Sequence, residues 1–141
     1  MIEQATKRTA ECSNCGGACE GWVIQISEKG RLRWEIEWSC DVCGISHDGG
    51  WGPAPEHIRQ ALISDHGISC IRISAATAHR GKVLKAFREA LGVPIQEANA
   101  LAKELAATGW QGTQVETSLI AELLQASDIA VQECDRGLGD Q

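Results

Sequence analysis

Two pairs of closely spaced cysteines are the residues of this 141-residue sequence best suited to chemistry. Cys12 and Cys15 form one Cys-x-x-Cys unit, Cys40 and Cys43 form the other, and a glycine follows each unit. Two intervening residues let a tight turn aim both sulfurs at one ion, and the small residue that follows lets backbone amides donate to the thiolates. The 24 residues between the units suffice for a hairpin that brings the two turns together. The spacing therefore predicts one zinc ion held by four thiolates.

The paired units resemble the zinc ribbon family over residues 12 to about 46. Iron in rubredoxin-like sites uses the same four ligands, so the spacing leaves the metal open, and the lack of an electron-transfer context favours zinc. Four thiolates leave no free coordination position, so the ion should be structural rather than catalytic. A ribbon of about 45 residues has too small a core to hold itself together without the metal.

Two residues near these units are weaker ligand candidates. If Cys19 replaced Cys12 or Cys15, the first unit would lose the spacing that matches the second, so we expect Cys19 to lie outside the site. His47 follows Cys43 by four residues, but four thiolates already complete the site. A solvated loop histidine is the simpler interpretation of His47.

The sequence shows no signature of an active site. It has no glycine-rich phosphate loop and no Gly-x-Ser-x-Gly motif. Cys70 lies in an apolar stretch, and we expect both Cys70 and Cys134 to be inert buried thiols. We therefore expect a protein that is not an enzyme. The enzymatic alternative would use Cys19 with His47 and Asp48.

Charge and composition narrow the compartment and the class of partner. The chain has 13 Lys and Arg against 19 Asp and Glu, a net charge of −6, whereas a protein that neutralises phosphates usually has the opposite balance. We expect a protein partner with a basic surface rather than nucleic acid. No apolar stretch is long enough to cross a bilayer and no signal peptide is seen, which predicts a cytoplasmic protein without a membrane partner. In that reducing compartment, seven cysteines argue against a disulfide framework.

The N-terminal half alternates with the period of a β-strand. Trp22, Ile24 and Ile26 repeat every second residue, as do the apolar residues from Leu32 to Trp38, which predicts a half-buried hairpin. Its turn should lie in residues 27–31, with Gly30 at positive φ. The glycine- and proline-rich residues 44–55 indicate a boundary. We expect a zinc ribbon over residues 1–54 and a connector helix over residues 55–67, whose core face is Ile58, Ala61 and Leu62.

From residue 68 onward the pattern predicts strand, helix, helix, strand, helix, strand. The expected strands span residues 68–74, 112–117 and 129–134. Gly92 should end the first helix, Pro94 should begin the second, and residues 118–126 should form the third. Such an order is typical of helices packed on one face of a three-stranded sheet, so the predicted fold class is α+β.

Residues 80–104, "RGKVLKAFREALGVPIQEANALAKE", resemble the C-terminal domain of the bacterial ribosomal stalk protein. The identities with that family's pattern are Lys85, Arg88, Gly92, Glu97, Ala98 and Leu101. The element order over residues 68–135 also fits that domain, and the substrate-recognition adaptor of the Clp protease shares its architecture. The resemblance implies a β-α-α-β-α-β domain over residues 68–141.

In the stalk family the face between the two helices docks translational GTPases. The resemblance therefore implies partner-binding roles for Arg80, Lys85, Arg88, Gly92 and Val93. The pattern also departs from the family: Pro94 replaces the second glycine of the bend, Gln96 and Asn99 replace two lysines, and Leu91 replaces a threonine. Losing two positive charges weakens electrostatic steering toward an acidic GTPase. A solvated helix face is an equal alternative for the basic cluster of Arg80, Lys82, Lys85 and Arg88.

Tryptophans give a second candidate interaction surface. Trp34, Trp38 and Trp51 belong to the ribbon half, where they either form its own core or provide a binding face. Together these features predict a non-enzymatic, cytoplasmic protein-binding module that acts as an adaptor or an inhibitor, including an immunity or antitoxin role. The alternative is a zinc-ribbon protein that associates with the ribosome or nucleic acid and docks on the translation machinery.

Overall fold

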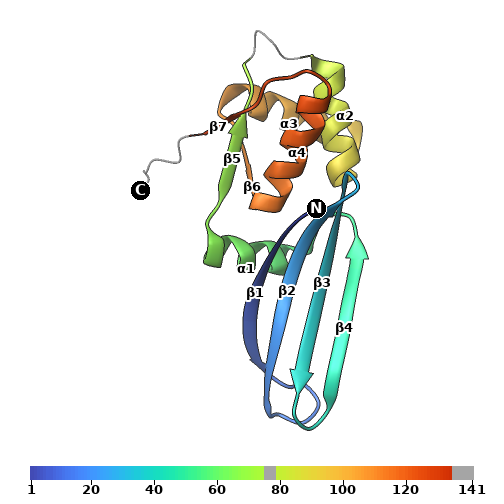
Figure 1. The fold of residues 1–141 in the computed structure, drawn as a ribbon, viewed down its shortest axis with the longest axis vertical. Coiled ribbons are helices and arrows are strands. Elements are labelled where there is room, and N and C mark those ends of the chain that lie inside the picture. Colours follow the sequence, from blue (N-terminus) through green and yellow to red (C-terminus); the bar gives the residue numbers. More distant parts are fainter. Residues whose placement is uncertain (75–78, 135–141) are drawn as a thin grey trace.

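The computed structural model describes residues 1–74 and 79–134 of the chain. Two antiparallel sheets, one of four strands and one of three, combine with helices in an α+β fold, which confirms the predicted fold class. The elements in chain order are β1 (Ile2–Glu11), β2 (Ala18–Glu28), β3 (Arg31–Cys40), β4 (Gly44–Trp51), α1 (Glu56–His66), β5 (Ser69–Arg72), α2 (Arg80–Leu91), α3 (Ile95–Ala107), β6 (Trp110–Gly112), α4 (Gln114–Ala126) and β7 (Gln132–Glu133). The long four-stranded sheet extends away from the unit that contains α2, α3 and α4 (Figure 1).

The N-terminal half is a meander of four strands in the order β1-β2-β3-β4, rather than a single hairpin. The predicted hairpin is its centre, and the two-residue turn between β2 and β3 has positive φ at both Lys29 and Gly30, as a type I′ turn requires. Most of the stretch that predicted a boundary between the two halves instead forms β4. The four-stranded sheet therefore continues to Trp51, and the boundary comes after that residue. The glycines of that stretch were misleading because they have a packing role.

Glycines lie next to tryptophan rings on the neighbouring strands. Gly50 pairs with Trp34 and Gly21 pairs with Trp38. A Cβ atom on Gly21 would lie 2.6 Å from a ring carbon of Trp38, and one on Gly50 would lie 3.3 Å from Nε1 of Trp34. The rings therefore occupy the space that side chains at these two positions would fill. Glycine is depleted in strands in general, but here it makes room for a large aromatic neighbour.

Helix α1 packs on the inner face of the four-stranded sheet. Its residues Ile58, Ala61 and Leu62 are buried against Val23 of β2, with Trp34 of β3 packed at the margin. This confirms the predicted core face of the helix. Gly67 ends α1 with φ of 86°. The helix is therefore part of the core beneath the sheet as well as a connection between the two halves of the chain.

The C-terminal half contains the predicted order of elements, with β5 central in a sheet of order β6-β5-β7. Phe87 of α2 is fully buried and meets the ring of Trp110 edge to face, with centroids 5.5 Å apart. Leu32, at the start of β3, belongs to the same buried cluster, so the two halves share one core. No helix among the described residues is long and apolar enough to span a membrane.

The predicted strand over residues 112–117 was wrong in position. The strand β6 is Trp110–Gly112, and α4 begins directly afterwards with Thr113 as its N-cap. The Thr113 hydroxyl accepts a hydrogen bond from the Glu116 amide, and the Glu116 carboxylate accepts one from the Thr113 amide. This is a capping box, and Thr-x-x-Glu is its sequence signature.

The expectation of free thiols at Cys70 and Cys134 was also wrong, as was the argument from a reducing compartment that the cysteines form no disulfide. A disulfide joins these two residues, which are 64 positions apart in the chain. Beside it, the Cys134 amide donates to the Cys70 carbonyl oxygen at 3.0 Å. A Cβ atom on Gly109 would lie 2.4 Å from Sγ of Cys134, so the glycine leaves room for the disulfide. The bond fixes β7, which has only two residues, to the edge of β5.

We expect Cys134→Ser to lower the free energy of unfolding by about 2–4 kcal/mol, because the disulfide limits the conformational freedom of a long loop in the unfolded chain. Denaturant unfolding of the oxidised wild type and the variant measures the difference. Reduced wild-type protein serves as the control, since it should unfold as the variant does. Equal stability of oxidised and reduced wild type would contradict the prediction.

Candidate metal centre

The four predicted ligands lie in two turns at one end of the four-stranded sheet. Cys12 and Cys15 belong to the connection between β1 and β2, Cys40 ends β3, and Cys43 precedes β4. Because the sheet is a meander, both connections lie at the end away from α2, α3 and α4 (Figure 1). The hairpin between them therefore brings the two cysteine pairs together as the sequence predicted.

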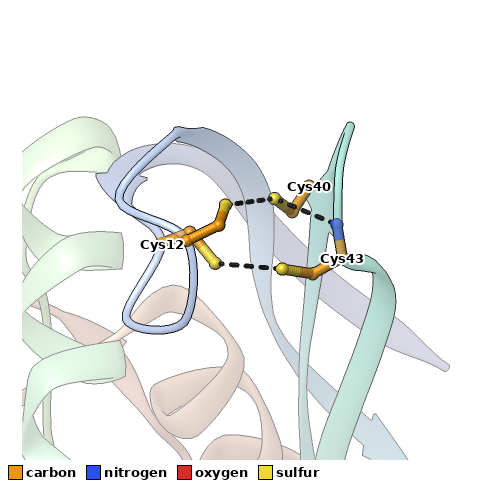
Figure 2. Close-up of side chains that lie close together, drawn as sticks. Cys12, Cys40 and Cys43 are labelled. Atoms are coloured by element: carbon orange, nitrogen blue, oxygen red, sulfur yellow. Dashed lines mark hydrogen bonds between the residues drawn. The ribbon is translucent and has the colours of Figure 1, made fainter.

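The sulfur atoms have the spacing of a tetrahedral metal site. All four lie within 4.8 Å of one another. The Sγ atoms of Cys12 and Cys43 are 3.8 Å apart, and those of Cys15 and Cys40 are 3.5 Å apart. The side chains of Cys12, Cys40 and Cys43 converge on one point between the turns (Figure 2). A zinc–sulfur bond of about 2.3 Å gives a tetrahedron whose sulfurs are about 3.8 Å apart. The Cys12–Cys43 and Cys15–Cys40 separations are close to that value, and no other pair exceeds it by more than about 1 Å.

Backbone amides lower the pKa of two of the four thiols. Amides of Cys15 and Asn14 lower the pKa of the Cys12 thiol to about 6. Amides of Cys43 and Val42 lower the pKa of Cys40, and the Cys43 amide lies 3.5 Å from Sγ of Cys40. The glycine after each cysteine pair makes this turn possible, with φ of 75° at Gly16 and 91° at Gly44.

Neighbouring sulfurs raise the pKa of the other two thiols, Cys15 and Cys43. The sulfurs of Cys15 and Cys12 raise the pKa of Cys43 to about 12. The Gly17 amide lowers the pKa of Cys15, but the sulfurs of Cys40 and Cys12 outweigh it, so the net shift is upward. Four thiolates therefore need a cation among them. In the described part of the chain, these four cysteines are the only group of three or more acidic, cysteine or histidine side chains with metal-site spacing.

The two weaker ligand candidates lie outside this group. Cys19 is buried in β2 opposite Cys40, and burial raises the pKa of its thiol to about 12. His47 lies in β4, where its Nε2 atom is 3.5 Å from a carboxylate oxygen of Glu35. The four cysteines can hold one ion without either residue.

The structure divides the predicted tryptophan surface between the two sides of the sheet. Trp34 and Trp38 point to the inner face, where both are partly buried. Trp51 lies on the outer face, is 52% exposed, and has the guanidinium of Arg31 4.6 Å above its ring. Trp22 is also on the outer face and is 46% exposed. Trp22 and Trp51 therefore lie on one exposed face of the sheet, and Trp34 and Trp38 lie on the opposite face.

The basic residues that were predicted to form one cluster lie along α2 and interact with different partners. Arg80 donates to the Asn99 side chain, and Lys82 donates to the Ser127 carbonyl oxygen at 3.1 Å near the end of α4. Lys85 forms an exposed ion pair with Glu89 at 3.7 Å. The surface hollow between α2 and α3 has a volume of ≈ 500 Å³. Its lining includes Lys85, Arg88, Gly92 and Val93, together with Leu84 and Ile95.

A buried polar network joins the two halves of the chain, and the sequence did not reveal it. Glu116 of α4 accepts hydrogen bonds from Arg59 of α1 at 2.7 and 2.9 Å and from Gln25 of β2 at 3.0 Å. Gln25 in turn accepts a hydrogen bond from the Thr113 hydroxyl. The capping-box spacing of Thr113 and Glu116 is the only part of this network with a sequence signature. Nothing in the alternation of β2 marks Gln25 as a buried partner.

Comparison with protein-family models, curated proteins and solved structures finds no match to this chain.

Proposed function

We propose that the protein is a non-enzymatic, cytoplasmic protein-binding module, an adaptor or an inhibitor of the immunity type, in which one zinc ion has a structural role. The observation that carries the metal assignment is the convergence of four cysteine sulfurs with nearly tetrahedral spacing. Thiolate ligands in a tetrahedral set favour zinc over the harder divalent cations. Because four sulfurs fill the coordination shell, the ion supports the binding surface rather than acting on a substrate.

The outer face of the four-stranded sheet is the proposed binding surface for a protein partner with a basic surface. Trp22 and Trp51 are exposed there together with Glu37, with Glu20 paired to Lys7 at 2.9 Å and with Arg31 over the Trp51 ring. Exposed tryptophan flanked by charged residues is typical of binding hot spots, which combine a large apolar contact with a polar rim. The net charge of −6 favours a partner of opposite sign.

The hollow between α2 and α3 supports the alternative of docking on the translation machinery. It brings together Lys85 and Arg88 with Gly92 and Val93, four of the residues that the stalk resemblance implies. Ile95, which is 54% exposed, adds an apolar contact at its margin. Glu89 also lines the hollow and pairs with Lys85, so the electrostatic preference for an acidic partner such as a translational GTPase rests mainly on Arg88.

Affinity capture from the source cell with matched variants distinguishes the two proposals. Trp22→Ala with Trp51→Ala removes the outer-face contact, and Lys85→Glu with Arg88→Glu reverses the charge of the hollow. If the first proposal holds, the tryptophan variant weakens the recovered complex by about 30-fold or more, which corresponds to about 2 kcal/mol, and the charge variant does not. The reverse result supports docking on the translation machinery.

If both variants recovered the partner as the wild type does, neither surface would be the binding site. Metal analysis of the same samples tests the zinc assignment, which requires one zinc ion per chain. RNA and DNA binding with a steep dependence on salt would instead favour a nucleic-acid partner.

A further inference from the structure

The fifth cysteine of this region, Cys19, lies directly opposite the metal ligand Cys40 in the pairing of β2 with β3. Both side chains project to the inner face of the sheet, and both residues are 7% exposed. Four thiolates suffice for the ion, so the position of Cys19 beside the site has no explanation in metal binding. Its relation to Cys40 is fixed by the backbone rather than by a flexible turn.

The hydrogen-bonding pattern of the hairpin shows whether Cys19 and Cys40 form a hydrogen-bonded or a non-hydrogen-bonded pair. Glu28 and Arg31 flank the two-residue turn and therefore form a hydrogen-bonded pair. The pairs alternate along an antiparallel ladder, so Cys19 and Cys40, nine steps farther on, form a non-hydrogen-bonded pair. In such pairs the Cα atoms lie about 4.5 Å apart, which is within the range that a disulfide bridges.

Solvent reaches this pair from the side of the metal site. A surface hollow of ≈ 310 Å³ opens there, and Cys12, Cys19, Cys40, Cys43 and Trp38 are among its lining residues. Hydrogen peroxide is small enough to enter such a space. The two sulfurs are thus largely shielded from bulky reagents and open to a small oxidant.

We propose that Cys19 is the resolving cysteine of an oxidation site, which forms a disulfide with Cys40 and thereby releases the metal. The Cys40 sulfur attacks one oxygen of hydrogen peroxide, the O–O bond breaks, and a sulfenic acid and hydroxide are formed. The Cys19 sulfur then displaces the sulfenic hydroxyl, which leaves as water with the Cys19 proton. The two sulfurs are oxidised, the peroxide is reduced, and the zinc ion keeps its charge but loses a ligand. The inference rests on the four-thiolate centre and is independent of the partner.

Two other sulfur pairs compete with this disulfide. Cys12 with Cys43 and Cys15 with Cys40 are 3.8 and 3.5 Å apart, because all four side chains point toward the same space between the turns. Those disulfides would join the turn between β1 and β2 to the end of β3 or to the turn after it. The bond between Cys19 and Cys40 closes across two strands that the sheet already holds in place.

Treatment of the zinc-loaded full chain with a small excess of hydrogen peroxide tests the proposal. Zinc release is followed with a chromophoric chelator, free thiols are alkylated, and disulfides are mapped by mass spectrometry without reduction. We expect a peptide that joins Cys19 to Cys40 to accumulate in step with zinc release. The disulfide of Cys70 and Cys134, present before treatment, is the internal reference.

The matched variant is Cys19→Ser, which keeps the size of the side chain and all four ligands. It should bind one zinc ion per chain as the wild type does. After oxidation, a small dithiol and added zinc should restore the wild type, whereas recovery of the variant falls several-fold because the Cys40 sulfenic acid proceeds to the irreversible sulfinic acid.

Three results would overturn the proposal. The first is a wild-type map in which Cys19 stays alkylated while Cys12–Cys43 or Cys15–Cys40 carries the disulfide. The second is equal recovery of the wild type and the variant. The third is loss of zinc from untreated Cys19→Ser, which would make Cys19 a ligand.

Discussion

We expect removal of the metal to unfold the distal end of the four-stranded sheet while the helical unit stays folded. The four ligands lie in the two turns at that end, and without a cation their sulfurs repel one another once ionised. The buried cluster around Phe87, Leu119 and Ile120 lies in the other half, apart from Leu32 at the start of β3, and contains no ligand. Hydrogen exchange should show lost protection near Ala18 and Cys40 after chelation, with protection of α2 and α4 retained.

The size of this effect follows from binding linkage. A metal that binds only the folded state stabilises it by about 4 kcal/mol when the free ion is 1,000 times above its dissociation constant. For a chain of this length, a change of that size corresponds to a shift in Tm of about 10 °C or more. Thermal unfolding with zinc and with an excess of chelator measures the shift, and added zinc should reverse it.

A ligand variant and a neighbouring variant separate metal binding from general damage. Cys40→Ser should reproduce the effect of chelation and abolish the response of Tm to zinc. Ser39→Ala, at an exposed position one residue away, should retain the wild-type response. If the chelated wild type kept full protection at the distal end, the metal would not have the structural role proposed for it.

The features that the sequence revealed are local ones. The spacing within each cysteine pair depends on one turn, and the number of residues between the pairs depends on one hairpin. The period-two alternation around Trp34 and the period of α1 around Ile58 are likewise set by near neighbours. These signals predicted the hairpin, the helices and the ligand set, because none of them needs a contact between distant parts of the chain.

The features that the sequence did not reveal depend on distant contacts. Gly50 indicated a loop, but its reason is the Trp34 ring on the next strand. The pairing of Cys70 with Cys134 spans 64 residues and is formed by β7 lying beside β5. Gln25 is buried because α4, about 90 residues later, presents a carboxylate to it. No local pattern contains that information, so only the assembled fold shows which polar residues are partners.

Neutralising Glu116 should destabilise the whole protein. Its side chain is 2% exposed and accepts two hydrogen bonds from Arg59, one from Gln25 and one from the Thr113 amide. Glu116→Gln keeps the size of the side chain but leaves the Arg59 guanidinium without its buried counter-charge. Breaking a buried ion pair costs about 3–5 kcal/mol, and we expect about 3 kcal/mol because Arg59 retains some contact with water.

Urea unfolding measures this loss, and Glu122→Gln is the matched control. Glu122 lies on the same helix but is exposed, so its neutralisation should change stability by less than about 0.5 kcal/mol. A double-mutant cycle of Arg59→Ala and Glu116→Ala should give a coupling energy of about 1–3 kcal/mol, because the two side chains are in direct contact.

The network also determines how the two halves unfold. Gln25 belongs to the four-stranded sheet, Arg59 to the helix beneath it, and Glu116 to the C-terminal half, so the carboxylate joins all three. Fluorescence of the tryptophans in the sheet and circular dichroism of the helices should therefore report one transition in the wild type. In Glu116→Gln the sheet should unfold at a lower urea concentration than the helices. Coincident transitions at wild-type stability would show that the shared apolar core around Leu32, and not this polar network, holds the halves together.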